Sequence, residues 1–276
     1  MSEDQLKILK VRIDKVTMLK TVTQIFIWLK SDKKRHIITP NPEILLKAQY
    51  NHKFLKILNK SDLNIPDGMG ILWAAYFLNQ TRNDSNKFYI LLKWLLSFLT
   101  LIFKKKKINA IIPERVTGTD LMEIICKNAP KYSTSIFLLG ASKGVAEIVK
   151  EKLEKKYNNL NIVGTYSGNP EVNSDTEIQN RINNCGAEVL FVAFGAPKQE
   201  IWIHRNLSKL KSVKVAIGIG GAFDFISGKR KRAPIWMQKT GLEWLYRLFK
   251  EPSRIKRIFN ATVRFPVIVL KKRLKR

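Results

Sequence analysis

Short apolar runs that end in glycine recur along this chain, and each is followed by a segment with helical character. Four of them are IFLLGAS (136–142), NIVGTYSG (161–168), AEVLFVAFGAP (187–197) and VKVAIGIGGAFD (213–224). Continuous apolar runs of this length, bounded by turn residues, are typical of strands that are buried on both faces. Their alternation with helices predicts an α/β fold, in which helices cover a mostly parallel sheet. Ligands of such sheets bind at the carboxyl ends of the strands, so the glycine turns mark the expected site.

The amino-terminal part continues this alternation. ILKVRIDKV (8–16) reads as one strand, and Thr17 is placed to cap a helix that runs towards Leu29. HIITPNP (36–42) predicts a short strand that ends in a loop with two prolines, and ILLKAQ (44–49) predicts the helix that follows. With 276 residues and 45% hydrophobic content, the chain can form one large α/β domain or two small ones.

Cysteine usage and the amino terminus indicate the same compartment. Cys126 and Cys185 lie far apart, which favours reduced thiols over a disulfide framework. The first ten residues, MSEDQLKILK, lack the apolar core of a secretory signal, so we expect the chain to stay in the cytosol. No stretch of the sequence reaches the roughly 20 apolar residues that a membrane-spanning helix needs.

Positive charge is concentrated at the carboxyl end. The formal net charge is +28, and residues 229–276 hold sixteen Lys or Arg against two acids, Glu243 and Glu251. We therefore expect residues 1–228 to form the core and residues 229–276 to form a basic appendage that binds phosphates, on nucleic acid or on an anionic membrane. The appendage has more aliphatic residues than base stacking requires, which favours the membrane. A basic nucleic-acid-binding α/β protein remains the alternative.

One segment, KFYILLKWLLSFLTLIFKKKK (87–107), interrupts the alternation. As a helix, its apolar stretch 88–103 would span about 24 Å, which is short of a bilayer core of about 30 Å. Its polar residues share one face of that helix, at spacings of four, three and four: Lys93, Ser97, Thr100 and Lys104. We expect an amphipathic, membrane-contacting helix inserted at about 85–107, with a core helix as the alternative.

Several common catalytic signatures are absent from the sequence. GIGGAFD (218–224) resembles a dinucleotide fingerprint only loosely, and neither GxGxxG after the first strand nor GxxxxGK[ST] occurs. No Asp-x-Asp pair is present to hold a divalent ion against a nucleotide diphosphate, and no GxSxG elbow occurs. The three histidines lack the spacing of a zinc site. We therefore expect no metal site.

Asp67 stands in NIPDGMG (64–70), between a proline and a glycine-containing turn that precedes an apolar helical run. Two interpretations are open from the residues alone. Aspartate is among the preferred helix N-caps, and apolar residues follow at helical spacing. A carboxylate on a turn with close backbone approach can also be catalytic.

Other polar residues follow further strand ends. They are Thr39 and Asn41 in ITPNPE, Arg115 in ERVTG, Gln199 in FGAPKQE, and Asp224 at the end of GIGGAFD. Each of them could instead be a cap, a turn residue or a surface group. Because the carboxyl ends of parallel strands meet at one edge of a sheet, we expect several of them to lie in one site.

The order of these motifs is specific. TPNPE, PDGMG, ERVTGTDLM, FLLGASKGVAE, FGAPKQEIWIHRN and RAPIWMQKTGLEWLYRL, in that succession, resemble the WecG/TagA/CpsF family of bacterial glycosyltransferases over about residues 8–260. The resemblance implies a Rossmann-like α/β core with a basic, helical C-terminal appendage. It also implies transfer of a sugar, N-acetylmannosamine above all, from a UDP-sugar to a polyprenyl-diphosphate-linked saccharide in cell-surface polysaccharide synthesis, as in teichoic acid.

Members of this family look inverting and metal-independent, so the resemblance implies neither a cofactor nor a metal. The implied partners are the UDP-sugar, the lipid-linked acceptor and an anionic membrane surface, with no nucleic acid and with room for a homo-oligomer. The implied location is the cytoplasmic face of the bacterial cell membrane, as a peripheral protein. Within the same class, another donor such as UDP-glucose is the alternative.

Matching motifs also carry residue roles into this chain. The resemblance makes Asp67 the general base towards the acceptor hydroxyl, and it places Thr39 and Asn41 where donor and acceptor meet. The positions expected to bind substrate are, together with the strand-end residue Asp224, Arg115, Gly140, Gly195, Gln199, Arg247, Arg254 and Arg257. The appendage arginines among them are expected to contact the diphosphate, for which a guanidinium fork is better suited than a lysine.

The sequence departs from the family pattern in three places. Ala141 stands where many members carry a second glycine, and SGNPE (167–171) lacks the more usual glycine-aromatic ending, so the donor sugar is open. The third departure is an insertion of about 25 residues that contains the 87–107 segment. We interpret it as an additional membrane contact near the acceptor entrance.

Overall fold

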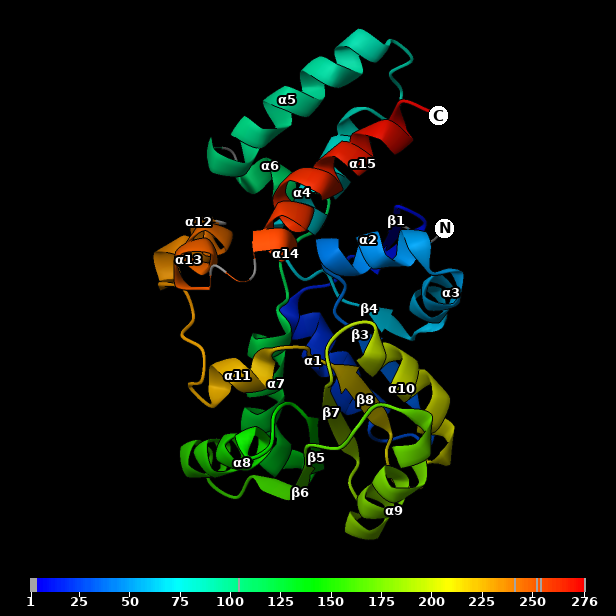
Figure 1. The fold of residues 1–276 in the computed structure, drawn as a ribbon, viewed down its shortest axis with the longest axis vertical. Coiled ribbons are helices and arrows are strands. Elements are labelled where there is room, and N and C mark those ends of the chain that lie inside the picture. Colours follow the sequence, from blue (N-terminus) through cyan, green and yellow to red (C-terminus); the bar gives the residue numbers. More distant parts are fainter. Residues whose placement is uncertain (1–3, 104, 241, 252, 254, 276) are drawn as a thin grey trace.

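A six-stranded parallel sheet forms the centre of one half of the molecule (Figure 1). The computed structural model describes residues 4–103, 105–240, 242–251, 253 and 255–275. The strand order is β4-β3-β8-β7-β5-β6, and all neighbours pair in parallel. The strands are β3 (Arg35–Ile38), β4 (Leu63–Asn64), β5 (Ser135–Gly140), β6 (Asn161–Tyr166), β7 (Val189–Ala193) and β8 (Val215–Gly218). The predicted Rossmann-like α/β fold is confirmed.

Helices cover both faces of the sheet, which is why its strands are continuously apolar. In β7, Val189 and Phe191 point to one face, whereas Leu190 and Val192 point to the other. The first face packs against α1 (Met18–Trp28), which begins after its predicted cap Thr17, and against α7 (Gly118–Asn128), α8 (Val145–Lys156) and α11 (Ala222–Ile226). The second face packs against α9 (Asp175–Cys185) and α10 (Lys198–Asn206). Short 3-10 helices occupy Ala129–Tyr132, Val172–Ser174 and Leu207–Lys209.

The amino terminus forms a hairpin, and the single strand expected over residues 8–16 is wrong. β1 (Gln5–Ile8) and β2 (Val11–Asp14) pair antiparallel in a separate two-stranded sheet. The chain reverses at Leu9 and Lys10, whose φ angles are 49° and 67°. Two consecutive positive φ angles match the twist of a two-residue hairpin turn, but this turn lacks the Asn or Gly that normally reveals it in a sequence.

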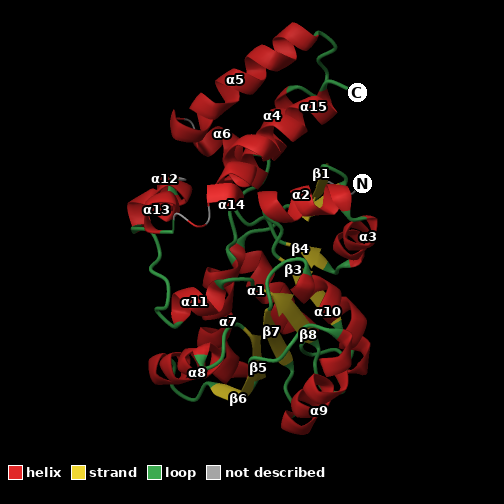
Figure 2. Cartoon of the chain, in the orientation of Figure 1, coloured by secondary structure: helices red, strands yellow, loops and turns green. Residues whose placement is uncertain are grey.

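The other half of the molecule is helical (Figure 2). Its hydrophobic cluster joins the hairpin to α2 (Pro42–Tyr50), α3 (His52–Lys60), α4 (Met69–Gln80) and the last helix, α15 (Phe265–Arg273). The chain reaches α15 through α12 (Ile235–Thr240), α13 (Glu243–Lys250), α14 (Ile255–Phe259) and the π-helical segment Asn260–Arg264. The basic appendage expected over 229–276 is therefore helical, as predicted.

The end of the appendage is packed into this helical half. Phe265 and Val269 are fully buried. Arg273 is also buried, and its guanidinium donates to the main-chain carbonyls of Thr81 and, at 2.6 Å, of Asp84. These carbonyls lie at and beyond the end of α4, where the helix cannot supply donors of its own. The appendage is thus attached to the core at both of its ends.

The inserted segment forms α5 (Lys87–Phe103) and the short α6 (Lys105–Asn109). Ser97, on the predicted polar face, is buried, and its hydroxyl accepts a hydrogen bond from the Trp73 indole of α4 at 2.8 Å. The hydroxyl faces inward because it is the partner that this buried N–H requires. Lys104 lies outside the described residues. None of the helices in the described ranges is long and apolar enough to cross a bilayer.

Candidate active site

Two adjoining cavities lie where the sheet half meets the appendage. The first, the strand-end cavity, has a volume of about 310 Å³ and is lined by the loops after β3, β4, β7 and β8, together with α13. The second, the appendage cavity, has a volume of about 240 Å³ and extends from the start of α4 to α14 and the segment that follows it. Six residues line both: Asn41, Glu43, Asp67, Glu243, Arg247 and Arg257. The strand-end cavity lies at the carboxyl ends of the strands, where the sequence predicts the site.

Asp67 lies at the junction of the two cavities. It does not cap α4, because Gly68 occupies the N-cap position and no side chain caps the helix. The helix-cap interpretation of Asp67 is therefore wrong. Its main-chain amide donates to the Pro40 carbonyl at 3.0 Å, and Gly68 turns away with a φ angle of 99°. Within the described residues, no hydrogen bond occupies the Asp67 carboxylate, so it faces both cavities unengaged.

The surroundings of Asp67 suit a base. Burial raises the pKa of its carboxyl from 3.8 to about 6, and this effect outweighs the opposing charges of Arg115 and Arg247. The negative charge of Glu243 raises the pKa further. A carboxylate with a pKa near 6 is mostly ionised at neutral pH, yet it holds a proton far better than a solvated aspartate.

Thr39 and Asn41 shape the loop that faces Asp67. The Thr39 hydroxyl is buried and donates to the Gly218 carbonyl at 3.0 Å, which joins the ends of β3 and β8. The Asn41 side-chain oxygen accepts from the Ile44 amide at 3.0 Å and so caps α2. The lone pairs of the Thr39 hydroxyl and the amide NH₂ of Asn41 stay available to a ligand.

Gln199 connects two loops from beneath the cavity. Its side-chain oxygen accepts from the Gly195 amide at 3.0 Å and from the Gly220 amide at 3.1 Å. Its NH₂ group donates to Glu200 at 2.8 Å. Only 1% of Gln199 is exposed. Gln199 lines the strand-end cavity and positions its glycine loops, and its expected contact with substrate stays a prediction.

Glu200 follows the same strand end as Gln199, and the sequence reasoning gave it no role. It is fully buried, and burial raises the pKa of its carboxyl to about 7, against the lowering effect of the hydrogen bond from Gln199. One oxygen of Glu200 accepts that bond. The other has no hydrogen-bond partner among the described residues. The sequence feature that could have indicated a role for Glu200 is its place as an acid after a buried strand and the turn that follows.

The two strand-end glycines differ in role. Gly195 lines the strand-end cavity, and a Cβ atom there would meet open space, although its φ angle of 79° favours glycine. Gly140 lines neither cavity. A Cβ on Gly140 would lie 2.8 Å from the main-chain carbon of Ala193, so this glycine allows β5 and β7 to approach. Its expected role beside the nucleotide is not supported by its position.

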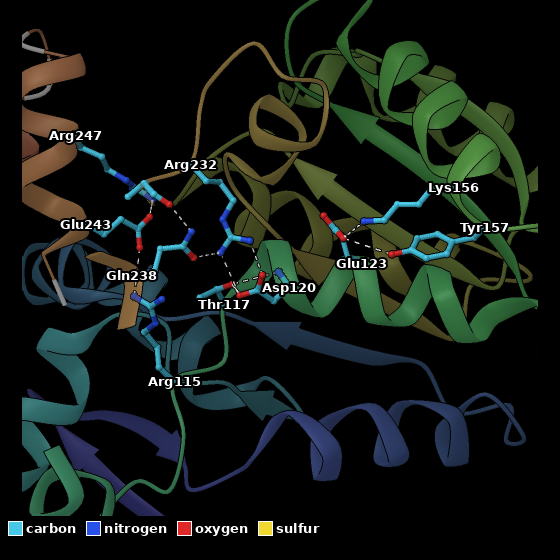
Figure 3. Close-up of polar contacts among 11 residues, drawn as sticks. Arg115, Thr117, Asp120, Glu123, Lys156, Tyr157, Arg232, Gln238, Glu243 and Arg247 are labelled. Carbon is cyan, nitrogen blue, oxygen red and sulfur yellow. Dashed lines mark hydrogen bonds and ion pairs between the residues drawn. The ribbon is translucent and has the colours of Figure 1, made fainter. Parts of the chain in front are cut away.

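Carboxylates hold the cations of the site (Figure 3). Arg115, before α7, donates to Glu243 of α13 at 3.3 Å, and Arg247 bonds the other oxygen of Glu243. Arg257 donates to Glu43 at 2.8 Å, and Lys47 contacts the same carboxylate at 2.9 Å. Burial would raise the pKa of Glu43, but Lys47 and Arg257 outweigh it and hold that pKa below its usual value.

Two further pairs complete this arrangement. The Arg232 guanidinium donates two hydrogen bonds, of 2.5 and 3.2 Å, to the Asp120 carboxylate, and it also donates to the side-chain oxygen of Gln238. Asp224, expected to bind substrate, contacts Arg230 at 3.4 Å. Arg254 lies outside the described residues. The paired residues that sequence reasoning missed are Glu43, Lys47, Asp120, Arg230, Arg232 and Glu243; the spacing of four between Glu43 and Lys47, and between Glu243 and Arg247, was the signal.

No group of three or more metal-ligating side chains occurs among the described residues. Metal independence stays a prediction, because the phosphates of a ligand can complete a metal site that the protein alone does not form.

Sequence comparisons with known proteins identify the family of this chain. The sequence model of the Glycosyl transferase WecG/TagA/CpsF family matches residues 6–98 and 99–276. A Bacillus subtilis (strain 168) protein named N-acetylglucosaminyldiphosphoundecaprenol N-acetyl-beta-D-mannosaminyltransferase is 33% identical over 235 residues, which are 85% of this chain and 78% of the relative. A Staphylococcus aureus (strain MRSA252) protein of the same name is 29% identical over 253 residues, 91% of this chain and 87% of that relative.

Proposed function

The chain belongs to the WecG/TagA/CpsF family of glycosyl transferases, and from that premise we propose that it transfers N-acetylmannosamine from a UDP-sugar to N-acetylglucosamine carried on polyprenyl diphosphate. The names of the Bacillus subtilis and Staphylococcus aureus relatives support this acceptor and this sugar. Another donor, such as UDP-glucose, is the alternative. Family membership disfavours the nucleic-acid-binding alternative.

The observation that carries the proposal is the place of Asp67 between two cavities. The strand-end cavity, with its glycine loops and cations, suits a nucleotide sugar. The appendage cavity suits the acceptor, because Met69, Trp244 and Ile258 give it an apolar lining beside the arginines. A sugar bound in each cavity would bring the acceptor hydroxyl oxygen and the anomeric carbon of the donor together at Asp67.

In this arrangement Asp67 accepts the proton of the acceptor hydroxyl. The hydroxyl oxygen then forms a bond to the anomeric carbon of the donor, while the bond from that carbon to the diphosphate oxygen breaks. UDP leaves with the electron pair, and a single displacement of this kind inverts the anomeric configuration. Arg247 and Arg257 line both cavities and would stabilise the charge that develops on the diphosphate.

These cations must first leave their present partners. Glu243 holds Arg115 and Arg247, and Glu43 holds Arg257 and Lys47. A diphosphate offers more acceptor oxygens than either carboxylate, so an exchange of partners accompanies binding. We propose that four protein cations take the part of a metal in neutralising the leaving group, and that the protein is peripheral at the cytoplasmic membrane face.

The test is sugar transfer from UDP-N-acetylmannosamine to a short-chain polyprenyl-diphosphate N-acetylglucosamine, with and without EDTA. We expect turnover that survives EDTA and that falls by about a hundredfold or more in Asp67→Asn. Asp32→Asn, which changes an exposed aspartate away from both cavities, is the matched control. Full activity of Asp67→Asn would remove Asp67 from the mechanism, and a folded protein that does not bind UDP would overturn the proposal.

A further inference from the structure

One side of α5 is firmly packed against the protein. Ile90 and Ser97 are buried, and the Phe98 ring stacks on Trp73 of α4 at 5.0 Å between ring centroids. The Trp94 indole donates to the Pro266 carbonyl of α15 at 3.3 Å. Figure 1 shows α5 along the edge of the molecule that is farthest from the sheet, with α4 and α15 beside it. The helix is therefore a fixed part of the helical half.

The opposite side of α5 is apolar and uncovered. Seven large side chains, each between 41% and 69% exposed, follow one another at helical spacing and form what we call the leucine face: Phe88, Tyr89, Leu91, Leu92, Leu95, Leu96 and Leu99. A soluble monomer rarely leaves such a continuous apolar patch in water. The leucine face therefore needs a partner.

The charges around the leucine face indicate which partner. Residues 85–113 contain six lysines and no acid, and one of the six, Lys93, pairs with Asp84 just before this segment. Lys87 lies at one end of α5, and Lys106 and Lys107 follow its other end, all three exposed. A protein interface normally has a polar rim with charges of both signs, whereas cations alone at the two ends of an apolar helix match anionic headgroups. With 17 residues, α5 is about 26 Å long, which is too short to cross a bilayer core of about 30 Å.

We propose that the leucine face lies in the plane of an anionic lipid bilayer, as a membrane contact separate from the basic appendage. This rests on the proposed function in one respect, namely that a lipid-linked acceptor brings the enzyme to a bilayer. Lysine ammonium groups at both ends of α5 contact lipid phosphates, while the leucine side chains enter the acyl boundary. The apolar side chains determine how deeply the helix enters the bilayer, and the lysines make it bind anionic lipid in preference to neutral lipid.

The contact also fixes the catalytic loop relative to the bilayer. α5 runs antiparallel to α4: Phe98 lies beside Trp73 near the start of α4, and Lys93 donates to the carbonyl of Gln80 at its end, at 3.2 Å. α4 begins two residues after Asp67. Because α4 is packed on α5, seating the leucine face holds Asp67 and the appendage cavity in one orientation towards the lipid surface.

The experiment is sedimentation with vesicles of phosphatidylglycerol and phosphatidylcholine in equal parts, compared with vesicles of phosphatidylcholine alone. The test variant is Leu95→Gln with Leu99→Gln, which removes two exposed leucines (54% and 53%) and keeps a good helix former. The matched control is Leu19→Gln with Ile27→Gln, which makes the same change at exposed positions (77% and 54%) of α1. We expect the α5 variant to bind anionic vesicles at least about tenfold more weakly, and the control to bind as the wild type does.

Three measurements decide the outcome: vesicle binding, the oligomeric state and sugar transfer. Equal vesicle binding by wild type and α5 variant would overturn the proposal. So would a lipid-free wild type that is a dimer by analytical ultracentrifugation and that becomes a monomer in the α5 variant, because a second copy would then cover the leucine face. Turnover of the short-chain acceptor should persist in the α5 variant. Weakened vesicle binding, in a protein that transfers no sugar, would leave this contact standing and the proposed function refuted.

Discussion

Glu243 of α13 lies between Arg115 of the core and Arg247 of its own helix, and it binds both guanidinium groups. This one carboxylate joins the appendage to the core at the edge of both cavities. It also places a negative charge near Asp67, whose pKa it helps to raise. The same contact therefore bears on substrate binding and on the state of the base.

The rate should follow the ionisation of Asp67. With a pKa of about 6, the carboxylate loses its role as a base when it is protonated, so kcat/KM should fall as the pH drops through about 6. Glu243→Gln removes a negative charge that raises the pKa of Asp67, so the acidic limb of the kcat/KM profile should move to lower pH. A pH profile of kcat/KM for the wild type and for the variant measures the limb and its shift. Glu151→Gln, on the exposed face of α8, should leave the limb in place.

Asp67→Asn should stabilise the protein at neutral pH. The folded-state pKa of about 6 exceeds the ordinary 3.8, so the folded state prefers the protonated form, and ionisation costs stability as the pH rises from about 4 to about 6. About two pKa units correspond to about 3 kcal/mol, and we expect about 2 kcal/mol because the side chain is partly exposed. Urea unfolding should show the gain at pH 7 and no gain at pH 3. A variant that is less stable at pH 7 would contradict this account.

Removing the Gln199 amide should loosen the glycine loops. Gln199→Ala leaves the part-buried Gly195 and Gly220 amides without their acceptor, and the cost for each should lie below the roughly 1–3 kcal/mol of a fully buried amide because water can reach them. We expect a lower melting temperature together with an increase in the Kd for UDP, measured by calorimetry. Gln179→Ala also breaks a side-chain hydrogen bond, to Asn206, but far from the cavities. It should lower stability without changing the Kd for UDP.

A pair of glycine substitutions separates close packing from backbone strain. Gly140 has a φ angle of 107°, and a Cβ there would approach the Ala193 backbone to 2.8 Å. Gly186 also has a positive φ angle, 65°, but a Cβ there would meet nothing within 4 Å. We expect Gly186→Ala to cost about 1 kcal/mol and Gly140→Ala at least about 3 kcal/mol, because β5 and β7 must move apart. Equal costs in denaturant unfolding would show that packing at Gly140 does not matter.

The fold was predictable where apolar pattern and turn residues agree. The buried strands around Phe137 and Phe191, each followed by glycine, fix a parallel sheet with helices on both faces. The hairpin turn at Leu9 and Lys10 was not predictable, because neither residue normally adopts positive φ and tertiary packing imposes it. The sequence predicted the polar face of α5 but not what that face contacts. The partner of Ser97 is Trp73, which belongs to another helix, so this contact depends on how α4 and α5 pack.

The site was predictable as a set of positions but not as a set of contacts. Parallel strand ends bring Thr39, Asp67 and Gln199 to one edge, and that much follows from the alternation of elements. The sequence does not say which groups neutralise one another across the fold. The pairing of Arg115 with Glu243 spans 128 positions, and burial of Gln199 beneath the loops depends on how α10 packs. Long-range ion pairs are a property of the folded chain alone.

The paired cations of the site also determine how selective it is. A protein with a net charge of +28 attracts anions in general, from nucleic acid to free phosphate. Glu43 and Glu243 hold four cations of the site, so their two negative charges offset half of that positive charge, and an entering anion must compete with a carboxylate for each cation. A ligand with two linked phosphates can compete with both carboxylates at once, whereas a single phosphate has fewer oxygens with which to replace them. The two carboxylates thus lower the affinity of the site for simple anions, which keeps a strongly basic enzyme from being occupied by the wrong ligand.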